Sequence, residues 1–77
     1  DSISSTILVY PNPTTGILNV TETSSTATYI IYNLIGQSIM KGNLSNNIID
    51  VSNITTGNYL LEITDNGNIT SKRIIKQ

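Results

Sequence analysis

Residues that favour turns recur at short intervals along this chain and divide it into short apolar runs. Clusters of Pro, Gly, Asn, Asp and Ser separate runs of about four to eight residues that are rich in Ile, Val, Leu and Tyr. Strong helix formers are scarce, because the sequence has one Ala, two Glu and one Met, whereas Ile and Thr together supply 25 residues. The pattern therefore predicts an all-β fold.

Alternation within the apolar runs predicts which side chains are buried, since successive side chains of a strand point to opposite faces. We expect strands at 7–10, 17–20, 27–33, 38–41, 48–51, 57–63 and 69–76. The side chains expected in the core are Leu18, Val20, Ala27, Tyr29, Ile31, Ile49, Val51, Tyr59, Leu61 and Ile63, with Ile54 plugging the corner at 52–56. Seven short strands with turns every 8 to 12 residues are typical of a small antiparallel sandwich.

Three turns have chemistry specific enough to predict their geometry. Pro11-Asn12-Pro13 stops strand pairing, because proline lacks an N–H group and has a fixed φ, and the chain turns again before Gly16. Gly36 supplies a positive φ to a tight turn. Asp65-Asn66-Gly67-Asn68 contains the Asn-Gly pair that favours a two-residue hairpin.

The length of 77 residues corresponds to a single domain. We expect residues 7–77 to form that domain, and residues 1–6, which are small and polar, to be the remnant of a linker from a longer protein. Because the chain has no Cys, the domain has no disulfide, and packing of β-branched side chains must stabilise it.

The composition also removes most kinds of chemistry. A chain without Cys and His has no thiol nucleophile, no imidazole proton shuttle and none of the ligands of zinc or haem sites. Carboxylate pairs that cleave glycosidic bonds need a cleft, which a domain of this size can hardly form. We therefore expect no enzyme activity, no metal and no cofactor.

The charges are few and unevenly distributed. Lys41 is the one cation among five acidic residues up to position 71, and Lys72, Arg73 and Lys76 follow within the last six residues. A net charge of -1 and a pI of about 4.9 argue against nucleic-acid binding. No apolar run approaches the roughly 20 residues of a membrane span, so we expect no membrane insertion. The basic tail is either a solubilising edge strand or a functional one.

Four blocks of this sequence, in order and in spacing, resemble the motifs of one known family. The blocks are 9–16 (VYPNPTTG), 32–37 (YNLIGQ), 54–63 (ITTGNYLLEI) and 72–76 (KRIIK). They are similar to those of the type A C-terminal sorting domain of the type IX secretion system of Bacteroidota, and the resemblance covers about residues 7–77. It implies an immunoglobulin-like β-sandwich.

The resemblance also implies a function. Such a domain directs an N-terminal cargo domain through the outer membrane by contact with translocon or shuttle proteins, passing through the periplasm to the cell surface or the medium. A sortase-like peptidase commonly removes it, and we expect a monomer. The residues that we assign to recognition are Pro11, Asn12, Pro13, Gly16, Gly36, Gly57, Tyr59, Lys72, Arg73 and Lys76.

Each of these residues also has a purely structural interpretation. Gly36 and Gly57 fit roles in backbone geometry, and Tyr59 fits a tyrosine corner at the start of a late strand. Because Lys72 and Arg73 are adjacent on a strand, they must point to opposite faces, and an edge strand carrying them could pair with a partner sheet.

Two other functions stay open at this stage. Tyr10, Tyr29 and Tyr32 lie in predicted strands, where they either pack in the core or form an aromatic platform of a carbohydrate-binding module attached to an extracellular enzyme. The other alternative is an immunoglobulin-like spacer that binds no ligand.

Overall fold

The computed structural model describes residues 7–77, which contain seven strands and no helix. The strands are β1 (Val9–Tyr10), β2 (Ile17–Val20), β3 (Thr28–Tyr32), β4 (Ser38–Asn43), β5 (Ile48–Asp50), β6 (Gly57–Asp65) and β7 (Asn68–Lys76). The predicted linker at 1–6 lies outside the described residues. The all-β prediction is confirmed, with small shifts at strand ends: β1 begins two residues later than expected, and β4 continues into the expected turn as far as Asn43.

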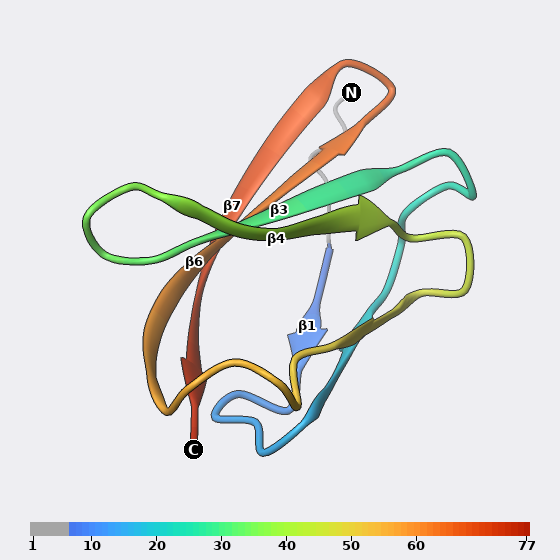
Figure 1. The fold of residues 1–77 in the computed structure, drawn as a ribbon. Coiled ribbons are helices and arrows are strands. Elements are labelled where there is room, and N and C mark those ends of the chain that lie inside the picture. The colour runs from blue at the N-terminus through green and yellow to red at the C-terminus, as the bar shows by residue number, and fades with distance from the viewer. Residues whose placement is uncertain (1–6) are drawn as a thin grey trace.

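The strands form two antiparallel sheets in the arrangement of an immunoglobulin-like sandwich (Figure 1). One sheet has the order β1-β2-β5 and the other β4-β3-β6-β7. The chain passes between the sheets after β2, β4 and β5, so that the central pairs β2–β5 and β3–β6 join strands that are distant in sequence. In immunoglobulin terms the sheets contain strands A, B and E, and C′, C, F and G.

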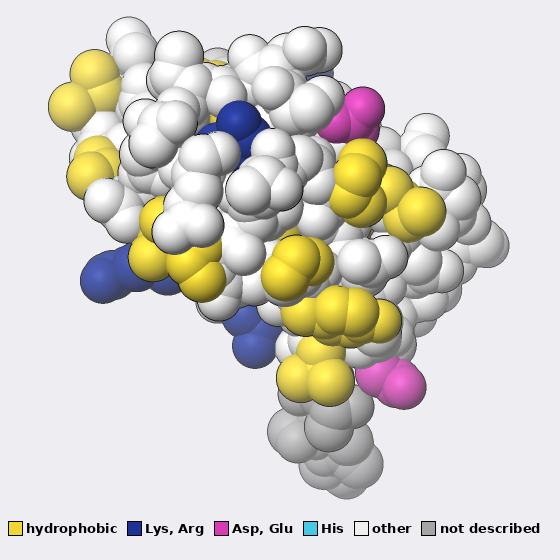
Figure 2. Space-filling model, turned by 90° about the horizontal axis from the view of Figure 1, so that it is seen from below, with side chains coloured by type: hydrophobic (Ala, Val, Ile, Leu, Met, Phe, Trp, Pro, Cys, Tyr) yellow, Lys and Arg dark blue, Asp and Glu magenta, His cyan; other side chains and the backbone are white. Residues whose placement is uncertain are grey.

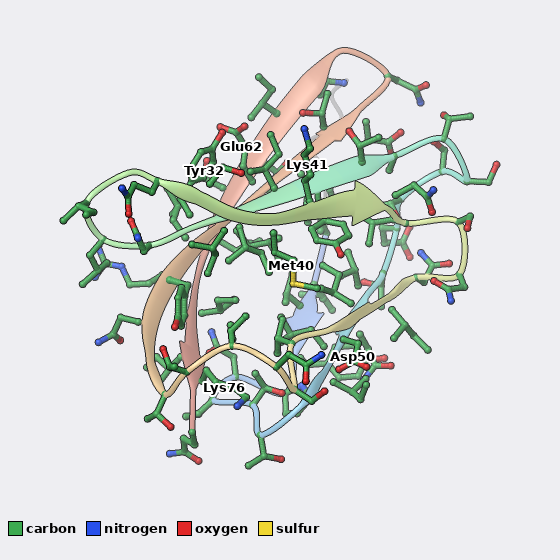
Figure 3. All side chains as sticks on the ribbon, in the orientation of Figure 1. Tyr32, Met40, Lys41, Asp50, Glu62 and Lys76 are labelled. Carbon is green, nitrogen blue, oxygen red and sulfur yellow. The ribbon has the colours of Figure 1, made fainter. Side chains whose placement is uncertain are left out.

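The core lies between the sheets and contains the side chains that alternation predicts. Every predicted inward residue is buried, and Ile54 packs against them from the corner. Ile7, Leu44 and Ile74 complete the same cluster. Figure 3 shows the alternation on β4, where Met40 points between the sheets and Lys41 points away from them. Burial of these aliphatic groups stabilises the domain by roughly 25 cal/mol per Å² of apolar surface removed from water.

The predicted turns have the expected geometry. Asn66 and Gly67 join β6 to β7 with φ values of 53° and 83°, the two positive values that a type I′ hairpin requires. Gly36 has a φ of 90° in the β3–β4 turn. Both hairpin predictions are therefore confirmed.

The loops gather at two ends of the sandwich, for which we use two names. The motif end consists of the β1–β2 loop, the β3–β4 turn, the β5–β6 corner and the last residues of β7, that is 11–16, 33–37, 51–57 and 73–77. The hairpin end consists of the β2–β3 loop, the β4–β5 turn and the β6–β7 hairpin. In Figure 1 the motif end lies at the bottom, with the β3–β4 turn projecting to the left, and the hairpin end lies at the top and right.

Candidate recognition site

The side chain of Asn12 binds the edge of the last strand. Its Nδ2 donates a hydrogen bond to the carbonyl oxygen of Arg73 at 2.8 Å, and its Oδ1 accepts one from the backbone N–H of Ile75 at 3.0 Å. An amide group has one donor and one acceptor end in the same plane, so it can pair with an edge strand much as a neighbouring peptide group would. Asn12 extends β7 pairing without being part of a strand itself.

Thr14 continues this contact through its backbone. Its N–H donates to the carbonyl of Ile75 at 2.9 Å, and its carbonyl accepts from the N–H of Gln77 at 2.8 Å, which makes a parallel bridge between the β1–β2 loop and the end of β7. The Thr14 side chain is 1% exposed, and its hydroxyl donates to the carbonyl of Ile17 and accepts from the N–H of Gly16. Asn12 and Thr14 together form what we call the Pro-loop clamp on β7.

The clamp divides the outer edge of β7 into two parts. The prediction of an edge strand is confirmed, since β7 is the last strand of its sheet. Its C-terminal part, from Arg73 onward, is covered by the clamp, whereas its N-terminal part around Ser71 borders no other strand of the described chain. Backbone pairing with a partner is therefore open only to the N-terminal part.

The β5–β6 corner is held by two side chains that bind backbone carbonyls. The Tyr59 hydroxyl donates to the carbonyl of Thr55 at 2.7 Å, which is the bond of a tyrosine corner, as expected from its place at the start of β6. The Lys76 ammonium donates to the carbonyl of Ile54 at 3.1 Å (Figure 3). Gly57, between them, has a φ of 156°, which L side chains rarely adopt.

The three cations of the tail occupy three different environments. Arg73 is exposed on the outer face of its sheet, and Lys72, its neighbour, points to the opposite, core-facing side at the edge. Lys76 is only 7% exposed. A long aliphatic stem allows a lysine to lie along apolar surface while its ammonium reaches a polar partner, here the carbonyl of Ile54. Arg73 is thus the tail cation most available to a partner.

The β3–β4 turn is fixed by one asparagine. The Asn33 carbonyl accepts a hydrogen bond from the N–H of Gly36, and its N–H donates to the carbonyl of Gln37. Its side-chain Oδ1 accepts from the N–H groups of Ile35 and Gln37 at 3.1 and 2.9 Å. The turn borders a hollow that is also lined by Tyr59, Leu60 and Arg73. The hollow thus lies between the β3–β4 turn, the start of β6 and the C-terminal part of β7.

The pKa shifts of Tyr32, Asp50 and Asp65 each have a local cause. Burial and the nearby carboxylate of Glu62, whose Oε1 lies 3.4 Å from the hydroxyl, raise the pKa of Tyr32 (Figure 3). Hydrogen bonds from Ser52 lower the pKa of Asp50, and those from Ser24 lower the pKa of Asp65. None of these groups adjoins a cluster of acidic residues that could hold a metal ion within 7–77.

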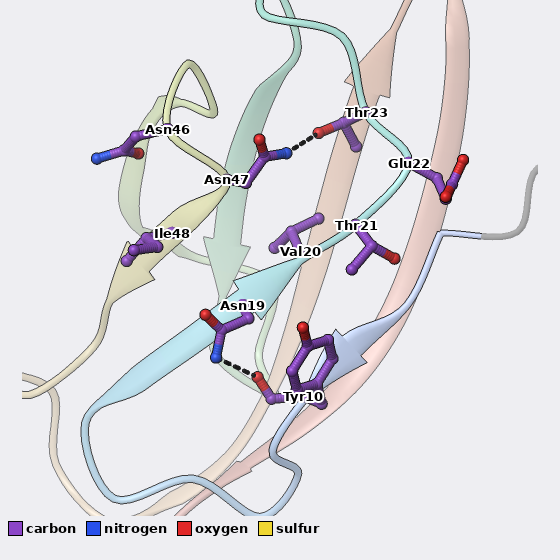
Figure 4. A pocket seen from close by; sticks show the side chains of 9 residues that line it. All are labelled: Tyr10, Asn19, Val20, Thr21, Glu22, Thr23, Asn46, Asn47 and Ile48. Atoms are coloured by element: carbon purple, nitrogen blue, oxygen red, sulfur yellow. Dashed lines mark hydrogen bonds between the residues drawn. The ribbon is translucent and has the colours of Figure 1, made fainter.

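The aromatic platform considered for a carbohydrate-binding module is not formed. Tyr29 is 8% exposed and belongs to the core, whereas Tyr10 and Tyr32 lie on different sheets. Figure 4 shows a polar hollow beside β2 in which Tyr10 is the only aromatic side chain. Two of its side-chain amides are already hydrogen-bonded within the protein, because Asn19 donates to the Tyr10 carbonyl and Asn47 donates to the Thr23 hydroxyl.

Comparison with known families agrees with this geometry. A sequence model of the family described as the secretion system C-terminal sorting domain matches residues 8–77. The chain belongs to this family. It is a C-terminal sorting domain of type IX secretion, and the family is one of sorting signals, not of enzymes. No individual curated protein matches the chain. Within 7–77 there is also no helix long and apolar enough to cross a membrane.

The sorting domain brings its four sequence blocks together at the motif end. The block at 9–16 clamps the block at 72–76, whose Lys76 holds the corner in the block at 54–63. The block at 32–37 forms the turn beside the shared hollow. Blocks that are far apart in sequence therefore form one continuous surface.

Three features of this surface were not predicted from the sequence. Thr14 and Asn33 are as central to it as the predicted residues, because each fixes a loop through several hydrogen bonds. A Thr that follows Pro-Asn-Pro and an Asn three residues before a Gly are the signals that could have revealed them. The third feature is the exposure of Leu34 and Ile35 at the tip of the β3–β4 turn.

Proposed function

We propose that the machinery of type IX secretion recognises this domain in its folded state, by protein-protein contact at the motif end. The observation that carries the proposal is the Pro-loop clamp, since Asn12 joins the first and last sequence blocks through the backbone of β7. A surface built from four distant segments exists only when the chain is folded. A rigid surface also favours tight binding, because little conformational entropy is lost on association.

The partners that we propose are translocon or shuttle proteins of the outer membrane. They would carry the domain and its N-terminal cargo across that membrane, and a sortase-like peptidase would then remove the domain. The cargo would remain on the cell surface or enter the medium. Membership of a sorting-domain family supports this sequence of events.

The central test fuses residues 1–77 to the C-terminus of a periplasmic reporter in a bacterium that has type IX secretion. We expect the reporter in the medium or on the cell surface, and we expect it in the periplasm when the same strain lacks the translocon. Retention of the fusion in the competent strain, with the domain folded, would refute the proposal. Such retention is what an immunoglobulin-like spacer would give.

A second fusion tests whether the folded state is what is recognised. Ile74 is fully buried in the core, so replacing it with Asp should unfold the domain. We expect this fusion to be retained, although all four sequence blocks are otherwise intact. Normal export of an unfolded Ile74→Asp domain would show that a linear segment is the signal.

A further inference from the structure

The tip of the β3–β4 turn exposes two large aliphatic side chains. Leu34 is 72% exposed and Ile35 is 79% exposed, more than any other large apolar residue of the described chain. The exposed tips of the other turns within 7–77 carry Ser, Thr, Asn, Gly, Glu or Pro. In Figure 2, which looks at the motif end from below, apolar side chains are visible at the left, the side to which this turn projects in Figure 1.

The turn does not need these two side chains for its own structure. Asn33 supplies the hydrogen bonds, and Gly36 supplies the residue with φ of 90° that closes a three-residue hairpin loop. Leu34 and Ile35 contribute only backbone atoms to this arrangement, and neither is among the residues packed against the core. Polar residues would serve the turn equally well and would be better hydrated.

The surroundings of the tip indicate the chemistry of a partner. Leu34 lines the same hollow as Leu60 and Arg73, so the apolar tip is continuous with a partly exposed apolar residue and flanked by one cation. Apolar patches rimmed by polar groups mark protein interaction sites. Arginine is also suited to carboxylate partners, because its planar group forms paired hydrogen bonds.

We propose that Leu34 and Ile35 insert into an apolar pocket of a protein of the type IX machinery, with a carboxylate at the pocket rim that binds Arg73. This proposal rests on the proposed function and names the part of the motif end that makes contact. A protein is favoured over a lipid surface because Arg73 is the only cation in the hollow and the neighbouring turn residues are uncharged. Binding to lipid surfaces normally combines apolar insertion with several cations.

The first test makes the tip polar in the reporter fusion of residues 1–77. We expect Leu34→Ser/Ile35→Ser to lower the exported fraction by about tenfold or more, because two apolar side chains lose their burial in the pocket. Ile69→Ser is the matched control, since Ile69 is 64% exposed on β7 near the hairpin end, and it should be exported like the parent. Unchanged thermal unfolding of both variants would confirm that the fold is retained.

Failure of this proposal and failure of the proposed function give different results. If the parent fusion is not exported, the domain is not a sufficient signal. If the parent and the folded Leu34→Ser/Ile35→Ser variant are exported equally, the domain is a signal but the tip does not bind the machinery.

The second test reverses the flanking charge. We expect Arg73→Glu to lower export severalfold, because a carboxylate would face the acidic rim of the pocket. Lys41→Glu makes the same charge change on the outer face of the sheet, away from the tip, and should have little effect. Equal export of the two folded variants would refute the role of Arg73.

The third test identifies what the tip contacts. A photocrosslinking amino acid at position 35 in secreting cells should form a covalent adduct with a type IX component, and one at position 69 should not. Two other outcomes would overturn the proposal. One is binding of the purified parent domain to vesicles of phosphatidylethanolamine and phosphatidylglycerol that the Leu34→Ser/Ile35→Ser change abolishes. The other is a dimer in sedimentation analysis that the same change converts to a monomer.

Discussion

The two ends of the sandwich are held together in different ways. At the motif end, the side chains of Asn12, Tyr59 and Lys76 bind backbone atoms of other segments. At the hairpin end, the side-chain hydrogen bonds between loops run from Ser24 to the carboxylate of Asp65 and from the side chain of Asn47 to that of Thr23, beside backbone bonds such as the one from Leu44 to Ala27. Backbone N–H and carbonyl groups are available almost whatever residue occupies a position, so the motif end depends on a few polar side chains of the right length. This explains how a sparse set of residues can specify a precise surface.

The strongest test of this contrast compares two isoleucines of β7. Ile74 is fully buried at the motif end, whereas Ile69 is 64% exposed near the hairpin end. We expect Ile74→Ala to lower the free energy of unfolding by about 2–5 kcal/mol, because it leaves a cavity in the core. Ile69→Ala should change it by no more than about 0.5 kcal/mol. Chemical denaturation measures both, and similar losses would mean that the buried Ile74 at the motif end contributes no more than the exposed Ile69 near the hairpin end.

The next test removes the Pro-loop clamp. Asn12→Ala breaks both side-chain bonds to β7 and should cost about 1–2 kcal/mol of unfolding free energy. Amide hydrogen exchange should also become faster at Ile75, whose N–H loses its acceptor. Asn46→Ala, in the exposed β4–β5 turn, is the control and should leave both quantities unchanged. Slow exchange at Ile75 in the Asn12 variant would contradict the role of the clamp.

A smaller effect is expected at the tyrosine corner. Tyr59→Phe keeps the aromatic ring in the core but removes the hydroxyl that donates to the carbonyl of Thr55. We expect a loss of about 1 kcal/mol in the free energy of unfolding. Tyr10→Phe is the matched control, because Tyr10 is 49% exposed, and thermal unfolding should show no change. Equal stability of the two variants would mean that the corner bond adds nothing.

The smallest effect is expected when each of two aspartates is replaced by asparagine. In Asp65 both carboxylate oxygens accept bonds from Ser24, whereas in Asp50 one oxygen accepts both bonds from Ser52. Asparagine has a single acceptor oxygen, so Asp65→Asn loses a bond and Asp50→Asn keeps both. We therefore expect a lower thermal midpoint at neutral pH for Asp65→Asn than for Asp50→Asn.

The difference should also depend on pH. Hydrogen bonds lower the pKa of Asp65 in the folded state below its usual value of 3.8, so the stability that they contribute is fully present above that value. It is lost as the pH falls through the lower, folded-state pKa. Thermal midpoints of the parent and Asp65→Asn should thus converge below pH 3.8. A constant difference across this window would contradict the assignment.

The fold was predictable because its signals are local. Alternation with a period of two identified the inward residues of β2, β3, β5 and β6, and the Asn66-Gly67 pair identified its hairpin. The predicted strand ends were less accurate. In β4, for example, pairing with β3 continues through Gly42 to Asn43, beyond the expected end at Lys41. There Gly42 lies against the ring of Tyr29, a contact that no local pattern reveals.

For the candidate recognition site, the sequence identified the four blocks but not how they are arranged in space. The contact of Asn12 with Arg73 spans 61 positions and uses a backbone atom, so no residue type at the acceptor position marks it. Burial of Lys76 was also missed, because lysine is normally exposed and only the distant carbonyl of Ile54 makes its position favourable. Exposure of Leu34 and Ile35 contradicts the usual polarity of turns, which is a signal that the sequence itself contains.

The Pro-loop clamp also affects when the domain can fold. Asn12 and Ile75 are 63 positions apart, so during synthesis the loop has no partner until nearly all of the domain has left the ribosome. Contacts over such separations form late and slowly. A chain that stops before Arg73 offers Asn12 nothing to bind, and its motif end stays open. Under the proposed function, the motif end is therefore complete only in proteins that have been translated through this last strand.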